Sequence, residues 1–388
     1  MFWRGAERDD DPRQDRADVR PAPGDWPKVV AVVPARDEAA VIDRSVGSLL
    51  SQAYPGALSV ILVDDGSSDG TGSIALAAAE KAGAAGRLTV LRGSEPPPGW
   101  TGKLWAMQWG FRHVQSGASP ADFVLFTDAD IAYEAADAVQ TLVRRALAHG
   151  TVLTSLMVKL RCDSLAEKVL VPAFIFFFQK LYPFAWVNDP RRGTAAAAGG
   201  CMLVRREALA TVGGLEAIRD ALIDDCALGA LLKRQGPIWL GLTERVASLR
   251  PYPAFGDIRR MVTRSAYAEL RYSPLRLAGA IAGMAVTYLA PPLLALFADG
   301  PARIMGVAAW AMMVAAYWPT LRAYGRSPAW GLALPLIAAA YTGFTVESAL
   351  QHWRGRGGAW KGRYQAQALP PKAAGAASPS PSGRAAGA

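Results

Sequence analysis

Acidic residues recur in this sequence just after short apolar runs. The runs lie at residues 28–34, 58–63 and 123–127. The acidic residues that follow them are Asp37, Asp64, Asp65, Asp128 and Asp130. Each run has the length and the β-branched or aromatic content of a buried strand, and ligands of open α/β sheets bind at the carboxyl ends of the strands. We therefore expect these carboxylates to meet at one edge of a sheet.

The pair Asp128 and Asp130 has the chemistry of a metal site. Two carboxylates one residue apart can share a divalent cation such as Mg²⁺ or Mn²⁺, and a nucleotide diphosphate would supply further hard oxygen ligands. The metal would then act as a Lewis acid on a departing diphosphate. The same spacing also occurs in solvated turns. The apolar run before Asp128, together with the other motifs, favours the metal-binding interpretation.

The segment VDDGSSDGT at residues 63–71 combines acids with turn-forming residues. Gly66 permits a tight turn after the predicted strand, and the serines and the threonine can cap the next helix. Asp64 and Asp65 could accept hydrogen bonds from a base N–H or from ribose hydroxyls. The alternative interpretation is a well-capped turn between strand and helix that binds no ligand.

A second acidic pair, Asp224 and Asp225, opens a predicted amphipathic helix. Carboxylates in a first helical turn favour the helix dipole, so capping is one interpretation. The functional interpretation is a general base that removes the proton from an acceptor hydroxyl. Gly199 and Gly200 lie upstream and would let an acceptor approach the backbone closely. Lys103, in a glycine-containing loop after three prolines, would contact phosphates or, alternatively, lie on the surface.

The composition argues against several classes of protein. The formal net charge is +9, but no basic stretch is interleaved with stacking aromatics, so nucleic-acid binding is not expected. The three cysteines and three histidines lack metal-ligand spacing, so neither a disulfide framework nor a structural zinc site is expected. The predicted compartment is the reducing cytoplasmic face.

Strands and helices are predicted to alternate through the first half of the chain. A fourth strand is expected at residues 88–92, and helical spacing of apolar residues covers 38–53 and 72–82. This alternation predicts an α/β fold with a mainly parallel sheet and right-handed crossovers. We place this domain at residues 28–270, after a flexible lead-in at residues 1–27.

The second half contains long apolar segments. The chain is 51% hydrophobic and 19% charged, and the apolar excess falls in three stretches of about the 20 residues that span a bilayer. These stretches are residues 275–298, 304–321 and 329–350. They predict a membrane domain of about three helices at 275–350, with a buried helical domain as the alternative. The aromatic segment 169–186 is expected at the membrane surface or, alternatively, in the core.

Basic residues bear on the orientation of the chain. Those at residues 322–326 favour a cytoplasmic loop and therefore a cytoplasmic catalytic domain. Three full crossings would then place the basic start of the tail, residues 351–388, outside the cell. Either the third apolar segment does not span completely or the tail departs from the positive-inside tendency. The end of the tail is predicted to be disordered.

Taken in order, these motifs resemble the family 2 glycosyltransferases. The matching segments are VPARDE (33–38), VDDGSSDGT (63–71), GWTGK (99–103), TDAD (127–130), GGCMLVRREAL with the later VGG (199–214) and DDCALG (224–229). The likeness covers residues 28–270, and the ordered set is far more specific than any single motif. Within the family, residues 187–206 and 260–274 and the C-terminal apolar segments are most similar to the hopene-associated glycosyltransferases of bacterial hopanoid biosynthesis.

The resemblance implies a GT-A type nucleotide-sugar-binding fold and a role for each matching residue. The residues implied at the nucleoside pocket are Pro34, Asp37, Asp64 and Asp65. Lys103 would face the diphosphate side, and Asp128 and Asp130 would contact ribose, diphosphate and a Mg or Mn ion. Asp225 would be the catalytic base of an inverting single displacement, and Asp224 would help to shape its site.

The chain departs from parts of that family. Processive polysaccharide synthases carry a Gln-x-x-Arg-Trp motif that holds the growing chain, and residues 261–265 keep only Arg264 of it. We therefore expect a single transfer, with Arg264 on the acceptor side. Lipid-modifying relatives often begin with a membrane helix, whereas this chain starts with a polar segment, so either that anchor is absent or the true start lies upstream. Residues 360–364 are similar to a stretch that returns to the catalytic domain in lipid glycosyltransferases.

Together these features predict a multi-pass enzyme of the bacterial cell membrane. It would move a sugar from a nucleotide-sugar, with a UDP-sugar favoured, to a hydroxyl of a hopanoid or related lipid. The membrane segments and the aromatic stretch at 174–186 would bring the site to an acceptor that stays in the bilayer. The alternative acceptors are polyprenyl phosphate, a diacylglycerol and a ceramide-like lipid. A non-catalytic membrane scaffold is a further alternative, against which the intact set of aspartates argues.

Overall fold

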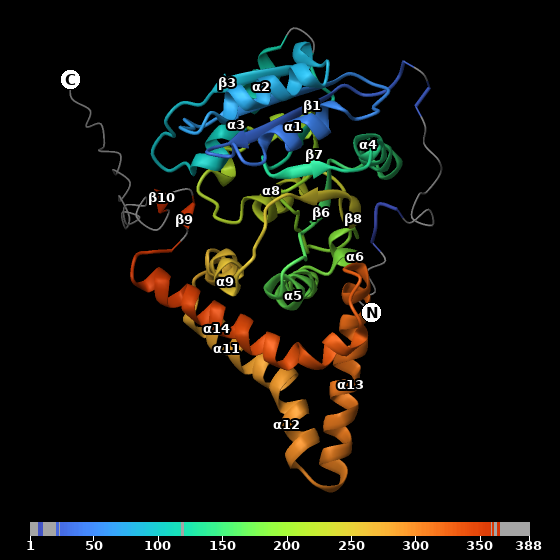
Figure 1. The fold of residues 1–388 in the computed structure, drawn as a ribbon, viewed down its shortest axis with the longest axis vertical. Coiled ribbons are helices and arrows are strands. Elements are labelled where there is room, and N and C mark those ends of the chain that lie inside the picture. Colours follow the sequence, from blue (N-terminus) through green and yellow to red (C-terminus); the bar gives the residue numbers. More distant parts are fainter. Residues whose placement is uncertain are drawn as a thin grey trace, which may run out of the picture.

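The computed structural model describes residues 7–10, 21–22, 24–117, 120–357, 359–360 and 363–364. Figure 1 shows two parts along the longest axis of the molecule: a sheet with its covering helices, and a set of long helices in orange and red. Two of the long helices, α12 (Ala290–Phe297) and α13 (Gly300–Ala323), point away from the sheet. A third, α14 (Leu334–Trp353), lies across the underside of the sheet-bearing part.

Eight strands form one mixed, mostly parallel sheet in the order β3-β2-β1-β4-β7-β6-β8-β5. They are β1 (Val29–Ala35), β2 (Leu58–Asp64), β3 (Leu88–Arg92), β4 (Phe123–Phe126), β5 (Ile131–Tyr133), β6 (Leu153–Lys159), β7 (Met202–Arg205) and β8 (Ile238–Ser248). β1 pairs in parallel with β2 and β4, and β2 pairs in parallel with β3. β7 is antiparallel to both β4 and β6. The predicted α/β fold with a mainly parallel sheet is therefore confirmed.

The side chains of β1 alternate between two hydrophobic clusters, as the period of a strand requires. Val29, Ala31 and Val33 pack with α1 (Ile42–Leu50), α2 (Thr71–Lys81) and α4 (Ala138–His149). Val30 and Val32 face the opposite cluster, with α3 (Gly102–Ser116) and α8 (Asp224–Leu232). Both faces of the sheet are thus covered, which explains why the strands read as continuous apolar runs.

All four predicted strands form, and their ends differ from the prediction by at most one residue. The two predicted helices form as α1 and α2, but α1 is shorter than residues 38–53 because the preceding loop is held by contacts to the next motif. Strands β5 to β8 were not predicted. They are short or irregular, and three of their pairings are antiparallel contacts between segments far apart in the chain.

Within the part of the chain that the structure describes, four helices are long and apolar enough to cross a membrane: Leu165–Val187, Pro274–Phe297, Gly300–Ala323 and Pro328–Trp353. The last three correspond to the predicted membrane segments. The first comprises α5 (Leu165–Leu181) and α6 (Phe184–Val187), and half of its apolar window is buried. Ile175 of α5 packs into the cluster beneath the sheet, whereas Val171 and Phe176 pack into a cluster with α13 and α14. α5 therefore lies between the sheet and the long helices.

The second long helix is bent. α11 (Pro274–Met284) continues through a π-helical turn at Ala285–Leu289 into α12. Pro291 and Pro292 lie just beyond that turn. A proline removes a backbone donor and clashes with the preceding turn, so a π-turn next to a proline pair is a physical cause of the bend.

Residues 7–10 lie against β8, although they belong to the lead-in that we expected to be flexible. The Leu242 N–H donates to Glu7 O (2.8 Å), and the Asp9 N–H donates to Leu242 O (3.1 Å). Asp9 is buried and accepts a 2.6 Å hydrogen bond from the Thr243 hydroxyl. The expectation is therefore wrong for these four residues, because they extend the pairing of β8. Most of the remaining lead-in, and the tail from residue 365, lie outside the described residues.

The packing of α3 on the sheet allows no side chain at Gly110. A Cβ atom there would lie 2.4 Å from Val32 Cγ1 and 3.1 Å from Val63 Cγ2. We expect Gly110→Ala to lower the free energy of unfolding by about 1–3 kcal/mol, because overpacking a core forces backbone shifts. Thermal unfolding of the purified protein in detergent measures the change.

The matched control is Gly47→Ala in α1, where a Cβ would meet no atom of the described residues within 4 Å. Alanine gains up to about 1 kcal/mol of helix propensity over glycine, so this variant should unfold at the same or a higher temperature. A Gly110→Ala variant as stable as the parent would contradict the packing.

Candidate active site

The predicted site residues converge where the sheet meets the long helices. Asp128 and Asp130 follow β4, and Lys103 lies in the first turn of α3, which Thr101 caps through a hydrogen bond from the Leu104 N–H (3.2 Å). Asp225 lies in the first turn of α8. Residues separated by up to about 120 positions in the sequence thus share one cleft.

Lys103 links the two acidic motifs. Its Nζ atom lies 2.8 Å from Asp128 Oδ1 and 3.1 Å from Asp224 Oδ2. Burial alone would lower the pKa of Lys103, but the charges of Asp128 and Asp224 outweigh it and raise the pKa. Lys103 is therefore a cation that neutralises both motifs, and the surface-lysine alternative is wrong. Burial also raises the pKa of Asp128, against the opposing effect of Lys103.

Asp225 is held in a fixed orientation by two backbone donors. Its Oδ2 accepts from the Gly199 N–H (2.9 Å) and its Oδ1 accepts from the Cys226 N–H (2.8 Å). Burial, followed by the charge of Asp224, raises the pKa of Asp225 to about 6. A carboxylate with a pKa close to the working pH suits general-base catalysis.

Asp130 has a partner that the sequence did not indicate. Arg250, two residues after β8, lies with Nε 2.6 Å from Asp130 Oδ2 and Nη2 2.8 Å from Glu38 Oε1. The guanidinium thus joins the loop after β1 to the acidic motif after β4. Arg250 had no local signal, because only the pairing of β8 with β5 brings it beside Asp130.

The two carboxylates after β4 supply only part of the ligand set that a divalent cation needs. Asp128 and Asp130 offer hard oxygen atoms, as Mg²⁺ and Mn²⁺ prefer, and their present partners, Lys103 and Arg250, show that positive charge is stable there. Within the described residues, no group of three or more His, Cys, Asp or Glu side chains is placed to hold a metal ion. Further ligands would have to come from a bound substrate.

The residues predicted for a nucleoside pocket tie two loops together. Asp64 Oδ1 accepts from the Ser67 N–H (2.8 Å), and Asp37 Oδ1 accepts from the Ser68 N–H (2.9 Å). Asp37 has a φ of 50°, in the left-handed region. Asp65 is buried, with Arg36 Nη1 donating to its main-chain oxygen (2.8 Å). Pro34 is buried within β1. Asp37 thus joins the loop after β1 to the loop after β2, and the nucleoside role of these residues stays a prediction.

The expected helix cap after this turn is not formed by a serine or threonine side chain. α2 starts at Thr71, and its N-cap is Gly70, with φ of 84°, which has no side chain to cap it; the Thr71 N–H donates to Asp69 Oδ1 (3.1 Å). The Thr71 hydroxyl accepts instead from the Glu38 N–H (2.9 Å). The correction follows from the left-handed turn at Gly70, which points the preceding serines toward the loop of Asp37.

One cavity of about 610 Å³ contains Asp225 and continues between the long helices. Its polar end is lined by Lys103, Asp128, Gly199, Gly200, Asp224, Asp225 and Arg264. Its other walls are mostly apolar and come from α5, α11 and α14, including Phe174, Phe177, Ile281, Met284 and Tyr341. The three residues predicted on the acceptor side, Gly199, Gly200 and Arg264, are thus brought together with the candidate base.

Gly199 and Gly200 let the backbone pack closely against neighbouring side chains in the wall of this cavity. A Cβ atom at Gly200 would lie 2.9 Å from Val158 Cγ2, and one at Gly199 would lie 3.4 Å from both Asp225 Oδ2 and Lys103 Nζ. Gly199 therefore lets the backbone N–H reach Asp225. Glu269, which sequence reasoning missed, also lines the cavity and accepts a 2.6 Å hydrogen bond from the Tyr182 hydroxyl.

Comparison with known proteins identifies the chemistry of this fold. Residues 30–213, slightly less than half of the chain, match the model of glycosyl transferase family 2. A mannosyltransferase from Pyrobaculum calidifontis, solved in complex with GDP-Man and Mn²⁺, superposes with a TM-score of 0.52 over 87% of this chain and 90% of its own, at 21% identity. The chain is a glycosyltransferase with a GT-A fold. No curated protein sequence matches it.

Two further solved structures are more distant from this glycosyltransferase. Glucosyl-3-phosphoglycerate synthase from Mycobacterium tuberculosis is 20% identical, with 64% of this chain and 82% of the other covered at a TM-score of 0.37. Mannosyl-3-phosphoglycerate synthase from Rubrobacter xylanophilus is 18% identical, with 63% and 73% covered at 0.39. At these scores the two structures carry no argument about the substrate of this chain.

The pKa of Asp225 predicts the pH dependence of the enzyme. A general base must be ionised to accept a proton, so kcat/KM should fall as the pH drops through about 6 and should not depend on this group well above it. Initial rates of sugar transfer across the pH range measure the profile. The residual rate of Asp225→Asn should lack this acid limb. A parent rate that stays constant far below the pKa of Asp225 would contradict its role as the base.

Proposed function

We propose that this glycosyltransferase moves a sugar from a nucleotide-sugar, preferably a UDP-sugar, to a hydroxyl group of a membrane lipid, with hopanoids as the leading acceptors. The observation that carries the proposal is the single cavity joining Asp225 to the apolar walls of α5, α11 and α14. A water-soluble acceptor would need no such walls, whereas a lipid could present its hydroxyl to Asp225 while its apolar body stays between the helices.

The residues at the polar end of the cavity fit an inverting single displacement. Asp225 takes the proton of the acceptor hydroxyl while that oxygen attacks the anomeric carbon, and the bond from this carbon to the diphosphate oxygen breaks on the opposite face. Gly199 holds the carboxylate in position through its N–H. Lys103, a cation between the two acidic motifs, offers positive charge to the diphosphate as negative charge develops there.

Asp128 and Asp130 are the residues that would hold a Mg or Mn ion in this proposal. The ion would neutralise the departing diphosphate as a Lewis acid. The mannosyltransferase of Pyrobaculum calidifontis, which shares the fold, was solved with GDP-Man and Mn²⁺. The nucleoside would lie above the loops of Asp37, Asp64 and Asp65, close to Pro34 at the end of β1.

The raised pKa of Asp225 favours a hydroxyl over a phosphate acceptor. A lipid phosphate reaches the site already deprotonated, so it would not need a base with a raised pKa, whereas a neutral hydroxyl needs deprotonation. The charges that line the cavity do not separate the two acceptors, because Lys103, Lys180 and Arg264 lie there with Asp128, Asp224, Asp225 and Glu269.

Sugar transfer with purified protein in lipid nanodiscs tests the proposal. Labelled UDP- and GDP-sugars would be supplied with hopanoids, polyprenyl phosphate, diacylglycerol or ceramide, in Mg²⁺ or Mn²⁺ and with EDTA. We expect label in a hydroxyl-bearing lipid only when metal is present, and a loss of about 10²–10⁴ in kcat for Asp225→Asn. Mass spectrometry of the product identifies the acceptor.

Asp220→Asn is the matched control, because it makes the same acid-to-amide change at an exposed residue outside the cavity. It should keep the parent rate. Transfer to polyprenyl phosphate alone would contradict the hydroxyl acceptor. Folded protein that binds the donor but transfers to none of the lipids would support the scaffold alternative.

Narrowing the apolar part of the cavity should weaken the binding of the lipid acceptor without changing the binding of the nucleotide-sugar. Gly283 of α11 lines the cavity, and a Cβ there would meet no described atom within 4 Å. We expect Gly283→Leu to raise the KM for the lipid while the Kd of the nucleotide-sugar is unchanged, because the new side chain narrows only the apolar part. Gly279→Leu is the control, since Gly279 lies one turn away in α11 with equal space but outside the cavity. Equal effects of the two variants would contradict an acceptor path along α11.

A further inference from the structure

The last long helix, α14, is bound to the sheet-bearing part at its C-terminal end. Ser348 donates from its hydroxyl to Thr263 O (2.6 Å) and accepts from the Tyr267 N–H (3.1 Å). Glu347 lies 3.4 Å from Arg259 of α9 (Phe255–Thr263). Thr342 and Thr345 line the same cavity as Asp225. The C-terminal half of α14 therefore borders the same cavity as the candidate base Asp225.

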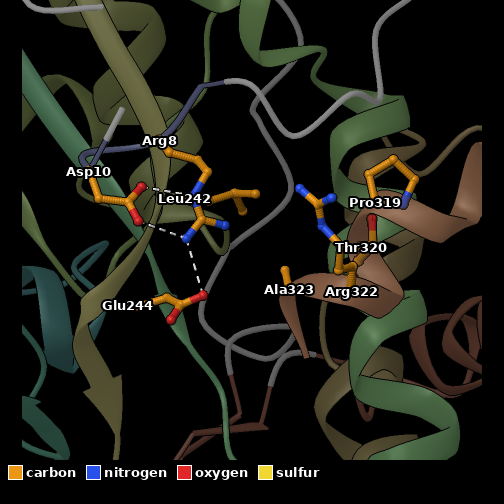
Figure 2. A pocket seen from close by; sticks show the side chains of 8 residues that line it. All are labelled: Arg8, Asp10, Leu242, Glu244, Pro319, Thr320, Arg322 and Ala323. Atoms are coloured by element: carbon orange, nitrogen blue, oxygen red, sulfur yellow. Dashed lines mark hydrogen bonds and ion pairs between the residues drawn. The ribbon is translucent and has the colours of Figure 1, made fainter. Parts of the chain in front are cut away.

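The N-terminal end of α14 is also held beside the sheet. The chain enters it from the end of α13, where the Tyr324 hydroxyl accepts from the Leu160 N–H at the end of β6 (3.4 Å). Figure 2 shows Thr320 and Arg322 of α13 facing Arg8 and Glu244 of the β8 edge across a small pocket. Between its two ends, the Tyr341 hydroxyl of α14 donates to Leu170 O of α5 (2.8 Å).

A helix held in this way cannot cross a bilayer. α14 has 20 residues and is about 30 Å long, which equals the thickness of the hydrocarbon core. A crossing would therefore place one end on the opposite face of the membrane, away from the sheet-bearing part. The C-terminal end contacts that part directly, and at the N-terminal end Leu334 packs in one cluster with Leu170 and Val171 of α5, so α14 runs along its underside, as Figure 1 shows.

The hairpin of α12 and α13 has the opposite character. It projects from the rest of the molecule (Figure 1), and large apolar side chains cover it. Phe297 is 78% exposed, Ile304 71% and Met305 69%. A Cβ at Gly306 would lie 2.5 Å from Ala295 N, so the two helices approach through a small residue, as helices in membranes do. An apolar projection of this kind matches lipid hydrocarbon.

The charged residues are distributed as this arrangement requires. Arg276, Arg322 and Arg354 lie at the ends of α11, α13 and α14 that adjoin the sheet-bearing part. On the hairpin, Asp299 and Arg303 lie at the tip, next to the start of α13. α13 has 24 residues, about 36 Å, but α12 has only 8, about 12 Å, so the hairpin projects by less than the thickness of the hydrocarbon core.

We propose that α14, with α11 beside it, lies in the interface of the leaflet next to the catalytic domain and does not cross the bilayer. The chain before α11, the loop after α13 and the chain after α14 are then all on one side. This removes the conflict between three crossings and the basic tail, because every basic end lies on the catalytic side. The inference uses the proposed membrane attachment but not the transfer reaction.

The arrangement also deepens the proposed acceptor path. α11 and α14 both line the cavity that contains Asp225. Helices lying in the interface would place that cavity at the depth of the lipid headgroups. A lipid could then slide its hydroxyl sideways between α11 and α14 to Asp225 without leaving its leaflet.

Cysteine labelling of the full chain tests this topology. Ser327→Cys and Arg356→Cys would each be made in a Cys162→Ser background, since Cys201 and Cys226 are buried. A membrane-impermeant maleimide would be applied to spheroplasts and to inverted vesicles, with labelling after permeabilisation as the measure of access. We expect Ser327→Cys and Arg356→Cys to be labelled from the same face.

Labelling of Ser327→Cys and Arg356→Cys from opposite faces would overturn the inference for α14. If a cysteine variant fails to fold, fusions to the C-terminus of the unmodified chain decide: a fluorescent protein active only in the cytoplasm and alkaline phosphatase active only outside it. We expect fluorescence without phosphatase activity, and the reverse result would contradict the proposal. Neither assay requires transfer activity, so failure of the proposed reaction would be distinguishable.

Discussion

The arrangement of the site depends on how several carboxylates are kept together in a partly buried cleft. Asp128, Asp224 and Asp225 would repel each other if each were held alone, and burial raises the cost of their charges. Lys103 lies between Asp128 and Asp224, and Arg250 lies on Asp130. These two cations set the spacing between the carboxyl end of β4, the start of α3 and the start of α8, and therefore the position of Asp225 relative to any bound donor.

The same cations connect distant parts of the chain. Lys103 joins the first turn of α3 to the first turn of α8, and Arg250 joins the end of β8 to the loops after β1 and β4. A buried ion pair is costly to break on one side only, because the remaining charge is left uncompensated. The site is thus part of what holds the two halves of the sheet in register. A donor whose phosphates attract Lys103 or Arg250 would therefore shift residues throughout the cleft.

The long helices form the apolar walls of the site. α5 lies between the sheet and the cluster formed with α13 and α14, so the apolar cavity begins directly at the catalytic residues. This contact would let an enzyme with a polar donor site act on the proposed acceptor while that acceptor remains in a membrane. It also fixes α14 against the sheet-bearing part, which leaves the hairpin of α12 and α13 as the part that projects.

Local sequence determined the four parallel strands, their acidic ends and the apolar segments, because burial on both faces of a sheet and insertion into lipid each leave an apolar pattern within one stretch of chain. It also placed Asp225 and the glycine pair among the site residues. Tertiary structure alone decided that Arg250 meets Asp130, that Lys103 joins two acidic motifs, and that residues 7–10 pair with β8. It also decided that one of three similar apolar helices lies flat. Hydropathy records how apolar a helix is but not what its ends touch, and the contacts of Ser348 and Tyr324 come from residues far away in the chain.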